Sequence, residues 1–184
     1  MKLGLISDTH DRLPTFRRAL ELFRRLEVDA VFHAGDLVAP FAAKLLTPAA
    51  GVLPKALAAD HVHVIYGNND GERAGLKKVL PQIADGPRHT SLSVAGFPGR
   101  EPGVCRVAVA HYLDWFSEQD LAAADLLVSG HDHQAKIQTQ IQAGREVLRV
   151  NPGECCGWVT GRCTVAVATI DADGIRAELI EVHG

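Results

Sequence analysis

The sequence predicts an α/β protein that folds as a single domain over residues 1–184. Strand-like and helix-like patterns alternate through the first half of the chain, and Val-, Ile- and Leu-rich runs separated by turn residues occupy the second half. The chain has 184 residues, of which 47% are hydrophobic, so it can bury one sizeable core. We find no internal repeat, low-complexity segment or linker that would divide it.

The first half is typical of strand–helix–strand units. An apolar run at 2–7 predicts the first strand, and Pro14 follows where a helix can begin, since a proline in the first turn loses no helical hydrogen bond. Apolar residues then recur at helical spacing, at Phe16, Ala19, Leu20, Phe23 and Leu26. Residues 30–33 predict the second strand. These units favour parallel strands.

The remaining elements follow from the same patterns. Residues 40–59 predict a helix broken around Pro48, Gly51 and Pro54, residues 61–66 a third strand, and residues 72–80 a short helix. The second half is mostly strand, with apolar runs at 104–110, 125–129, 146–150, 163–170 and 175–180. The turn sequence at 171–174 predicts that the last two strands form a hairpin.

Composition narrows the class of protein. The formal net charge is -3, so no broad basic face is expected, and we expect no stable complex with nucleic acid. No apolar run reaches the roughly 18 residues of a membrane helix, which predicts a cytoplasmic protein without membrane contact. A homo-oligomer stays open. The cysteines form no C-x-x-C pair and are expected to be small buried apolar residues: Cys105, Cys155, Cys156 and Cys163.

Polar residues that can hold a metal follow several of the predicted strands. In strand order they are Asp8 and His10, Asp36, Asn68 with Asn69, His111, and His131 with His133. Ligands of open α/β sheets gather at the carboxyl ends of the strands, so loops distant in sequence would converge there. Each cluster alone is ordinary turn chemistry. Together they offer carboxylate, imidazole and amide ligands that suit Mn, Fe or Zn, and the lack of a thiolate argues against a structural zinc site.

The ordered motifs D-x-H, GD, GNND, H and GHxH resemble the signature of the calcineurin-like metallophosphoesterases. The flanking text SDTHD, HAGD, YGNNDGER, SGHDH and NPGECCGWVTG resembles the small YfcE-like phosphodiesterase branch of that family, from Met1 to about residue 170. The resemblance implies two mixed β-sheets packed face to face as a sandwich flanked by α-helices.

The resemblance also implies a site for two divalent metal ions. Asp8, His10, Asp36 and His133 would hold one ion, and Asp36, Asn68, His111 and His131 the other, with Asp36 bridging. Manganese is the first candidate, with Ni, Fe, Zn and Mg as alternatives. A hydroxide bridging the ions would attack a small phosphodiester, with Asn68, Asn69 and His111 as catalytic residues. The alternatives are a phosphomonoesterase or nuclease of the same fold, or a non-catalytic scaffold. The filled ligand positions favour an enzyme.

The chain departs from the family pattern in three places. Tyr112 follows His111 where many relatives have Gly, and the loop up to Phe116 would either stack on an aryl or nucleoside group or pack into the core. Asn69 stands where distant relatives carry a His that can protonate the leaving group. Glu154 stands where many relatives have Ser, and we assign it no catalytic role.

Three further groups are expected to serve the structure. His33 would pack or hydrogen-bond close to the site, with a supporting contact to a ligand also open. Asp11 is either such a support or a turn residue before the helix. His61, His63 and His89 belong to no motif and are expected to be structural or on the surface.

Overall fold

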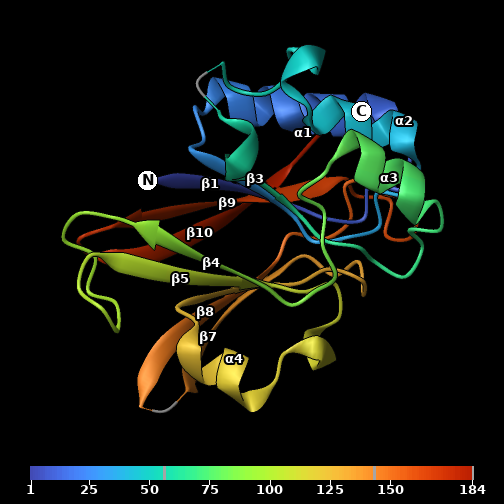
Figure 1. Cartoon of the computed structure of the whole chain (residues 1–184). Helices are drawn as coiled ribbons and strands as arrows, with labels where there is room; N and C mark the ends of the chain where they lie inside the picture. Colours follow the sequence, from blue (N-terminus) through green and yellow to red (C-terminus); the bar gives the residue numbers. More distant parts are fainter. Residues whose placement is uncertain (56, 143, 184) are drawn as a thin grey trace.

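Two five-stranded sheets packed face to face form the centre of the molecule (Figure 1). The structure is a computed structural model, and it describes residues 1–55, 57–142 and 144–183. Helices cover the outer faces of both sheets, as Figure 1 shows. The expected sandwich of two mixed sheets with flanking helices is therefore confirmed.

The first sheet has the strand order β10-β9-β1-β2-β3. Its parallel strands are β1 (Lys2–Ile6), β2 (Ala30–His33) and β3 (Val62–Val64), and each agrees with a predicted strand. β9 (Thr164–Asp171) runs antiparallel to β1, and β10 (Gly174–Glu181) pairs with β9 from Gly174 opposite Asp171. The predicted C-terminal hairpin is confirmed.

The second sheet has the order β4-β5-β6-β8-β7. Its centre consists of the parallel strands β5 (Val104–Val109), β6 (Leu126–Val128) and β8 (Arg145–Asn151), which were predicted. The edge strands β4 (Arg88–Ser93) and β7 (Lys136–Gln142) pair antiparallel with their neighbours and were not predicted. Their sequences RHTSLS and KIQTQIQ are largely polar, because an edge strand buries few side chains.

Helices α1 (Leu13–Arg25), α2 (Pro40–Ala43) and α3 (Arg73–Val79) cover the first sheet, and α4 (Glu118–Ala123) covers the second (Figure 1). The helix expected over 40–59, broken around Pro48, Gly51 and Pro54, is confirmed only in part, because α2 ends at Ala43. After α2 the chain makes only the 3-10 turns η1 (Lys44–Leu46) and η2 (Pro48–Ala50), and Gly51 ends η2 in a left-handed conformation. Two further 3-10 turns are η3 (Ala59–His61) and η4 (Leu113–Trp115).

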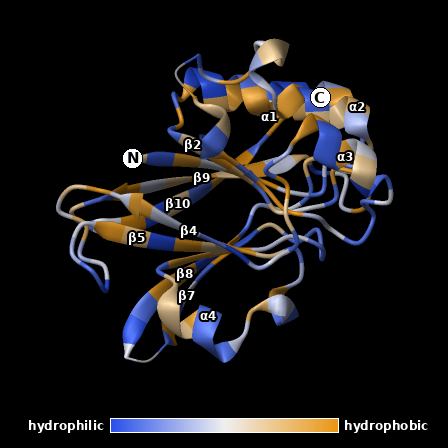
Figure 2. Ribbon diagram, viewed as in Figure 1, coloured by the Kyte–Doolittle hydropathy of each residue, from blue (hydrophilic) through white to orange (hydrophobic). Residues whose placement is uncertain are grey.

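Three apolar cores hold these layers together. The core between the sheets includes Leu5, Phe32 and Val128, and the core under α1 includes Phe16 and Phe23. A smaller core packs α4 onto the second sheet. Figure 2 shows the apolar residues on the strands and on the helix faces that meet them. No helix in the part of the chain that the structure describes has the length and apolarity needed to cross a membrane.

The sheets are aligned so that β1, β2 and β5 all run towards the same end of the sandwich (Figure 1). The loops that follow these strands therefore gather at one edge. The four cysteines are buried and free, as predicted. Their thiols form no disulfide among the described residues.

Candidate metal centre

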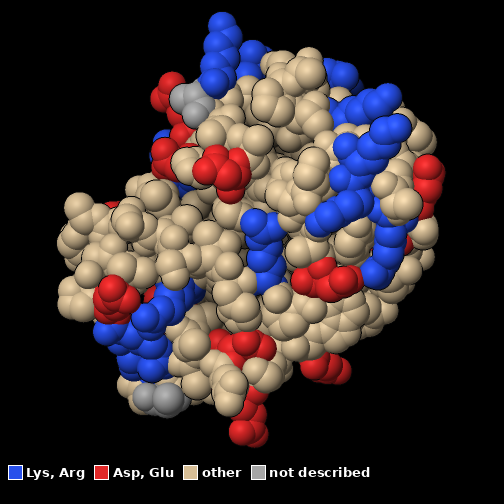
Figure 3. Space-filling model, viewed as in Figure 1, with Lys and Arg blue, Asp and Glu red and all other residues tan. Residues whose placement is uncertain are grey.

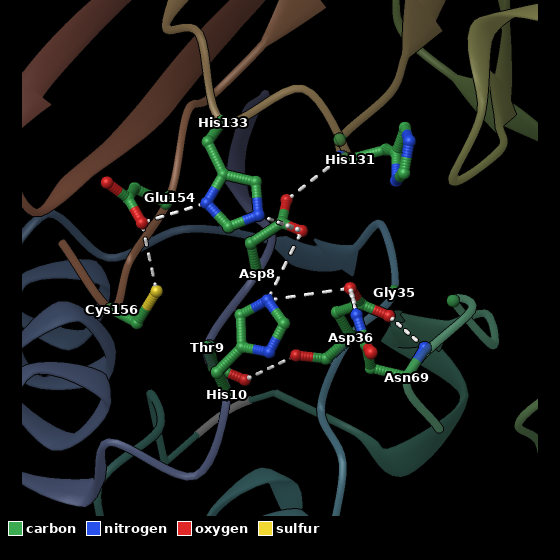
Figure 4. A network of polar contacts seen from close by, with 12 residues as sticks. Asp8, Thr9, His10, Gly35, Asp36, Asn69, His131, His133, Glu154 and Cys156 are labelled. Atoms are coloured by element: carbon green, nitrogen blue, oxygen red, sulfur yellow. Dashed lines mark hydrogen bonds and ion pairs between the residues drawn. The ribbon is translucent and has the colours of Figure 1, made fainter. Parts of the chain in front are cut away.

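Loops from both sheets bring the seven predicted metal ligands together. Figure 4 shows Asp8, His10, Asp36, His131 and His133 among them. The residues follow β1, β2, β3, β5 and β6, as predicted. They are Asp8, His10, Asp36, Asn68, His111, His131 and His133. We call Asp8, His10 and His133 the Asp8 side, and Asn68, His111 and His131 the Asn68 side.

On the Asp8 side, two imidazole rings point at one buried carboxylate. The Nε2 atoms of His10 and His133 lie 3.8 Å and 3.5 Å from Asp8 Oδ1. Asp8 Oδ2 accepts a hydrogen bond of 3.1 Å from the backbone N–H of His131. Asp8 Oδ1 and His10 Nε2 are buried and have no hydrogen-bond partner among the described residues. Buried polar atoms without partners are rare, so these two indicate a missing ligand.

On the Asn68 side, one amide oxygen meets two imidazoles. Asn68 Oδ1 lies 2.9 Å from His111 Nε2 and 3.1 Å from His131 Nδ1. Asn68 Oδ1 and the two ring nitrogens thus have partners within the site. On the Asp8 side, Asp8 Oδ1 and His10 Nε2 have none among the described residues. Asn68 can offer the same oxygen to a cation that it offers here to the rings.

Asp36 lies between the two sides. Its Oδ2 is 3.5 Å from His10 Nε2 and 3.4 Å from His111 Nε2. A ligand shared by two ions needs contact with both groups, and the Asp36 carboxylate lies close to an imidazole ring of each side, whereas Asp8 meets the imidazole rings of His10 and His133 and only the backbone of His131. The division of the seven residues between two ions stays a prediction, and this geometry supports it.

Two of the histidines have their metal-facing nitrogen fixed by an acceptor behind the ring. His111 Nδ1 lies 2.7 Å from the carbonyl oxygen of Ala34, and His133 Nδ1 lies 2.8 Å from Glu154 Oε2. Each acceptor holds a ring proton on Nδ1 and so turns Nε2 towards the centre of the site, where Nε2 can bind a metal once it carries no proton of its own. This is the usual arrangement behind a histidine that binds a metal.

Charges inside the site perturb its pKa values. Burial raises the pKa of Asp36, but hydrogen bonds and charge from His111 and hydrogen bonds from Asn69 outweigh it and hold the pKa well below the usual range. The Asp8 carboxylate, whose Oδ1 lies 3.8 Å from His10 Nε2, raises the pKa of His10 against the opposing effect of burial. Burial lowers the pKa of His111, and the contact with Asp36 more than reverses this. These contacts favour protonation of His10 and His111, and a metal cation could take the place of the bound protons.

The backbone at this site is strained. Left-handed φ angles between 39° and 73° occur at Asp8, His10, Asp36, His131 and His133. Such conformations cost roughly 1–3 kcal/mol each for residues other than glycine, and they cluster where function demands them. The backbone N–H groups of Thr9 and His10 both donate to the carbonyl oxygen of Asp36, which locks the two strained loops together.

Comparison with known proteins is consistent with this geometry. Residues 1–173 match the family described as the calcineurin-like phosphoesterase superfamily domain. The chain belongs to the calcineurin-like phosphoesterase superfamily. It is 31% identical over 186 residues to phosphodiesterase MJ0936 from Methanocaldococcus jannaschii, an alignment that covers 98% of this chain and 100% of the relative.

Solved structures of other superfamily proteins have the same fold. A novel archaeal phosphodiesterase is 29% identical with a TM-score of 0.70, and the match covers 98% of this chain and 100% of that one. YfcE, a phosphoesterase from E. coli, is 21% identical with a TM-score of 0.61 and is matched over 100% of both chains. At that identity the likeness to YfcE supports the fold alone.

Beside this candidate site, Asp70 organises the loop that carries Asp36. Its carboxylate accepts hydrogen bonds from the backbone N–H groups of Asp36 (3.1 Å), Val38 (2.6 Å) and Gly67 (2.6 Å). Gly67 has no room for a side chain, because a Cβ there would collide with the Asp36 carboxylate. The GNND motif thus supplies the support for Asp36 as well as Asn68.

His33 and Asp11 also support the loops. His33 Nδ1 accepts from the N–H of Gly35 (3.2 Å), and its Nε2 lies 3.1 Å from Thr9 Oγ1. Its ring is fully buried, and burial lowers its pKa to about 4, so it is neutral. Asp11 accepts from the N–H of Ala39 at 3.0 Å, which ties the loop after β1 to the loop after β2. The expectation that His33 packs and hydrogen-bonds beside the site is confirmed.

The sequence analysis missed Glu154. This buried carboxylate accepts hydrogen bonds from the backbone N–H groups of Trp158, Val159 and Thr160, and from the Thr160 hydroxyl, besides its contact with His133. Burial opposes its ionisation, but these bonds lower its pKa to about 2. Glu154 is therefore an anion that orients His133, a supporting contact that was not predicted; that Glu154 has no catalytic role stays a prediction.

The other residues that depart from the family pattern lie close to the ligands. Both the backbone N–H and the side-chain Nδ2 of Asn69 donate to Asp36 at 2.8 Å.

Phe116 is buried in the core with α4, so the packing interpretation holds for it. Tyr112 instead contacts His131, with ring centroids 3.8 Å apart and the rings tilted by 35°, and contacts Trp115 with a centroid distance of 4.9 Å. His63 is buried against Phe32, and exposed His89 pairs with Asp120.

Proposed function

We propose that this protein is a metal-dependent phosphodiesterase that hydrolyses a small phosphodiester with two divalent ions. The observation that carries the proposal is the convergence of seven ligand-type side chains on one point, where Asp8 Oδ1 and His10 Nε2 are buried without partners. The full-length relative named phosphodiesterase MJ0936 supports the diester as substrate. Manganese is the first candidate, and Ni, Fe, Zn and Mg are the alternatives.

The donor set fits two ions that share Asp36. The Asp8 side offers a carboxylate and two imidazoles, and the Asn68 side offers an amide oxygen and two imidazoles. When bound, the ions would polarise the phosphoryl oxygens and lower the pKa of water so that it can attack phosphorus. Asp36 keeps its negative charge for this purpose, because His111 and Asn69 favour the ionised form.

The chain itself contributes orientation. Asn68 and His111 contact each other on one side of Asp36, and Asn69 holds the Asp36 carboxylate by two hydrogen bonds. Asn69 follows Asn68 directly, and we propose that it faces the phosphoryl group. Its amide can donate a hydrogen bond to a phosphoryl oxygen but cannot give a proton to a departing alkoxide.

The surface charge supports a small substrate. On the face drawn in Figure 3, Lys and Arg side chains form separate groups with Asp, Glu and uncharged residues between them. A protein that binds a nucleic-acid polymer usually presents a continuous basic stripe. A phosphomonoesterase would use the same ligands, so the two activities have to be separated by experiment.

The test is a substrate panel assayed with the metal-free protein after addition of Mn²⁺, Ni²⁺, Mg²⁺ or Zn²⁺. We expect no turnover without metal, and faster hydrolysis of bis(p-nitrophenyl) phosphate than of p-nitrophenyl phosphate with at least one ion. Faster monoester hydrolysis with every ion would identify a phosphomonoesterase instead. Metal binding without hydrolysis of any ester would favour the non-catalytic alternative.

A further inference from the structure

An exposed indole, that of Trp158, lies beside the Asp8 side. The side chain of Trp158 is 64% exposed, although tryptophan is usually well buried. Its ring stacks on His10 with a centroid distance of 6.1 Å and an interplanar angle of 28°. One aromatic face therefore lies next to a proposed metal ligand, and much of the ring is open to solvent.

The loop that carries Trp158 is held rigidly. The backbone N–H groups of Trp158 and Val159 donate to the buried Glu154 at 2.9 and 3.0 Å, and that of Thr160 does so too. These bonds hold the backbone that carries the indole, and the stacking contact with His10 orients the ring. A ring that is fixed before binding loses little conformational entropy when a ligand stacks on it.

The aromatic residues on the Asn68 side already contact one another. Tyr112 contacts both His131 and Trp115, so its ring already has aromatic neighbours on the Asn68 side. His10 is the single aromatic contact of Trp158 among the described residues. Trp158 is thus the aromatic surface beside the site that is most available to a ligand.

We propose that Trp158 binds a planar aromatic group of the phosphoester by stacking, and so selects aryl or nucleoside esters over purely aliphatic ones. This inference rests on the proposed function, since it assumes that the phosphoryl group binds at the seven ligands. Base-on-aromatic stacking tolerates any planar ring, because every such ring has a π-face. The proposal fixes the chemical class of one ester group and leaves open whether it is a nucleobase or a simple aryl ring.

The test compares matched phosphonates, whose P–C bond the enzyme cannot hydrolyse. Phenylphosphonate and cyclohexylphosphonate carry the same anionic group and the same number of ring carbons, but only the phenyl ring is planar and aromatic. Titration calorimetry with the Zn²⁺-loaded protein should show phenylphosphonate binding at least about fivefold more tightly, which is the lower end expected for one stacked ring. The phosphonate analogues of AMP and of ribose 5-phosphate form a second pair, which tests the nucleobase.

Variants of the same loop provide the controls. Trp158→Ala should abolish the preference within the pair, and Trp158→Phe should keep most of it. Val159→Ala should change nothing, because the Val159 side chain is 71% exposed and its backbone N–H still reaches Glu154. All three changes leave the backbone contacts to Glu154 in place, so equal melting temperatures would verify the folding of each variant.

Fluorescence can place the ligand directly, since the chain has two tryptophans. In the Trp115→Phe background only Trp158 emits, and the aromatic phosphonate should quench or shift this emission more than its aliphatic partner does. A preference in either pair that depends on Trp158 supports the proposal and names the aromatic group. Equal binding within both pairs, or a preference that survives Trp158→Ala, would overturn it. These readouts need no turnover, so an inactive protein would count against the proposed function and leave the stacking result intact.

Discussion

The two sides of the metal centre are built from similar residues but are prepared for a cation in different ways. On the Asp8 side, a carboxylate oxygen and an imidazole nitrogen are buried without partners, and Glu154 holds His133 from behind. On the Asn68 side, the amide oxygen of Asn68 is already shared by His111 and His131. The unpartnered atoms of the Asp8 side cost free energy until an ion binds them. On the Asn68 side, Asn68 Oδ1 already has its partners.

The two sides also differ in the number of negatively charged carboxylates near the ion. With Asp36 counted for both, the Asp8 side has two carboxylates and the Asn68 side has one. An ion on the Asp8 side should therefore bind more tightly, because each additional anion close to a divalent cation strengthens its binding in a site of low dielectric. A two-ion site can thus contain one retained ion and one that exchanges more readily. The following predictions test this difference and the contribution of Asp36 to both sides.

The largest effect is expected from Asp36→Asn, which removes the anion that both sides share. We expect turnover to fall by at least about 10³-fold, the upper end for loss of one charge-stabilising group, because both ions are weakened. Kinetics and metal analysis by mass spectrometry would measure this. Asp85→Asn is the matched control, since Asp85 is a surface carboxylate paired with Arg73. Wild-type turnover and full metal content in Asp36→Asn would show that Asp36 is not the shared ligand.

The next effect concerns Asn69, which acts on both sides through Asp36. Asn69→Ala should lower turnover by about 100-fold on all substrates alike, as expected for one lost hydrogen-bond donor. Without a general acid, aryl diesters should react much faster than alkyl or nucleoside diesters, and Asn69→His should selectively speed the poor leaving groups. The measurement is log turnover against leaving-group pKa. A shallow slope that Asn69→His leaves unchanged would contradict the assignment.

Glu154→Gln should act on one side only. Glutamine keeps the shape of the side chain but offers fewer acceptor sites than the carboxylate, which now receives His133 and the N–H groups of the following loop. We expect metal affinity of the Asp8 side to fall by about 10- to 100-fold, the usual effect of losing the group behind a metal-binding histidine. Competition with a fluorescent chelator would measure it, with Glu101→Gln as a surface control. Equal weakening of both ions would contradict the separation of the sides.

The smallest effect expected is a dependence on pH of the stabilisation that added metal gives to the fold. Without metal, the pKa values of His10 and His111 are raised, so their protonation stabilises the fold fully below pH 6.5 and this stabilisation is lost as pH rises through the raised values. A metal binds only the deprotonated rings. The increase in melting temperature caused by added metal should therefore be larger at pH 8 than at pH 6. His89→Ala, which changes an exposed histidine, should not alter this trend.

The contrast between the sides also separates what could be predicted from the sequence. The convergence of the seven candidate ligands was predictable because each follows an apolar strand, and strand order sets where the loops meet. The central strands were predictable because continuous burial requires continuous apolar runs. Edge strands β4 and β7 have no such run. In the 40–59 segment the breaks around Pro48 and Gly51 were predicted, but the extent of helix was overestimated, because α2 ends at Ala43 and 3-10 turns follow it.

Glu154 and Trp158 were missed for a different reason. Their roles depend on how the loop after β8 folds back on itself, with N–H groups four to six residues ahead turned towards one carboxylate. No periodicity or residue spacing specifies such a loop. The chemistry of a strand end can therefore be predicted from the sequence, whereas the support behind a ligand and the aromatic residue beside it need the folded structure.

The most direct test of the two-sided centre is the number of metal equivalents retained by His131→Ala and His133→Ala after extensive dialysis. Only Asp132 separates the two histidines in sequence, yet His131 lies on the Asn68 side and His133 on the Asp8 side. We predict two equivalents in the wild type under saturating metal, and about one in each variant. We also predict that the ion retained by His133→Ala exchanges faster than the ion retained by His131→Ala. Loss of both ions from both variants, or equal exchange rates of the remaining ions, would contradict the account.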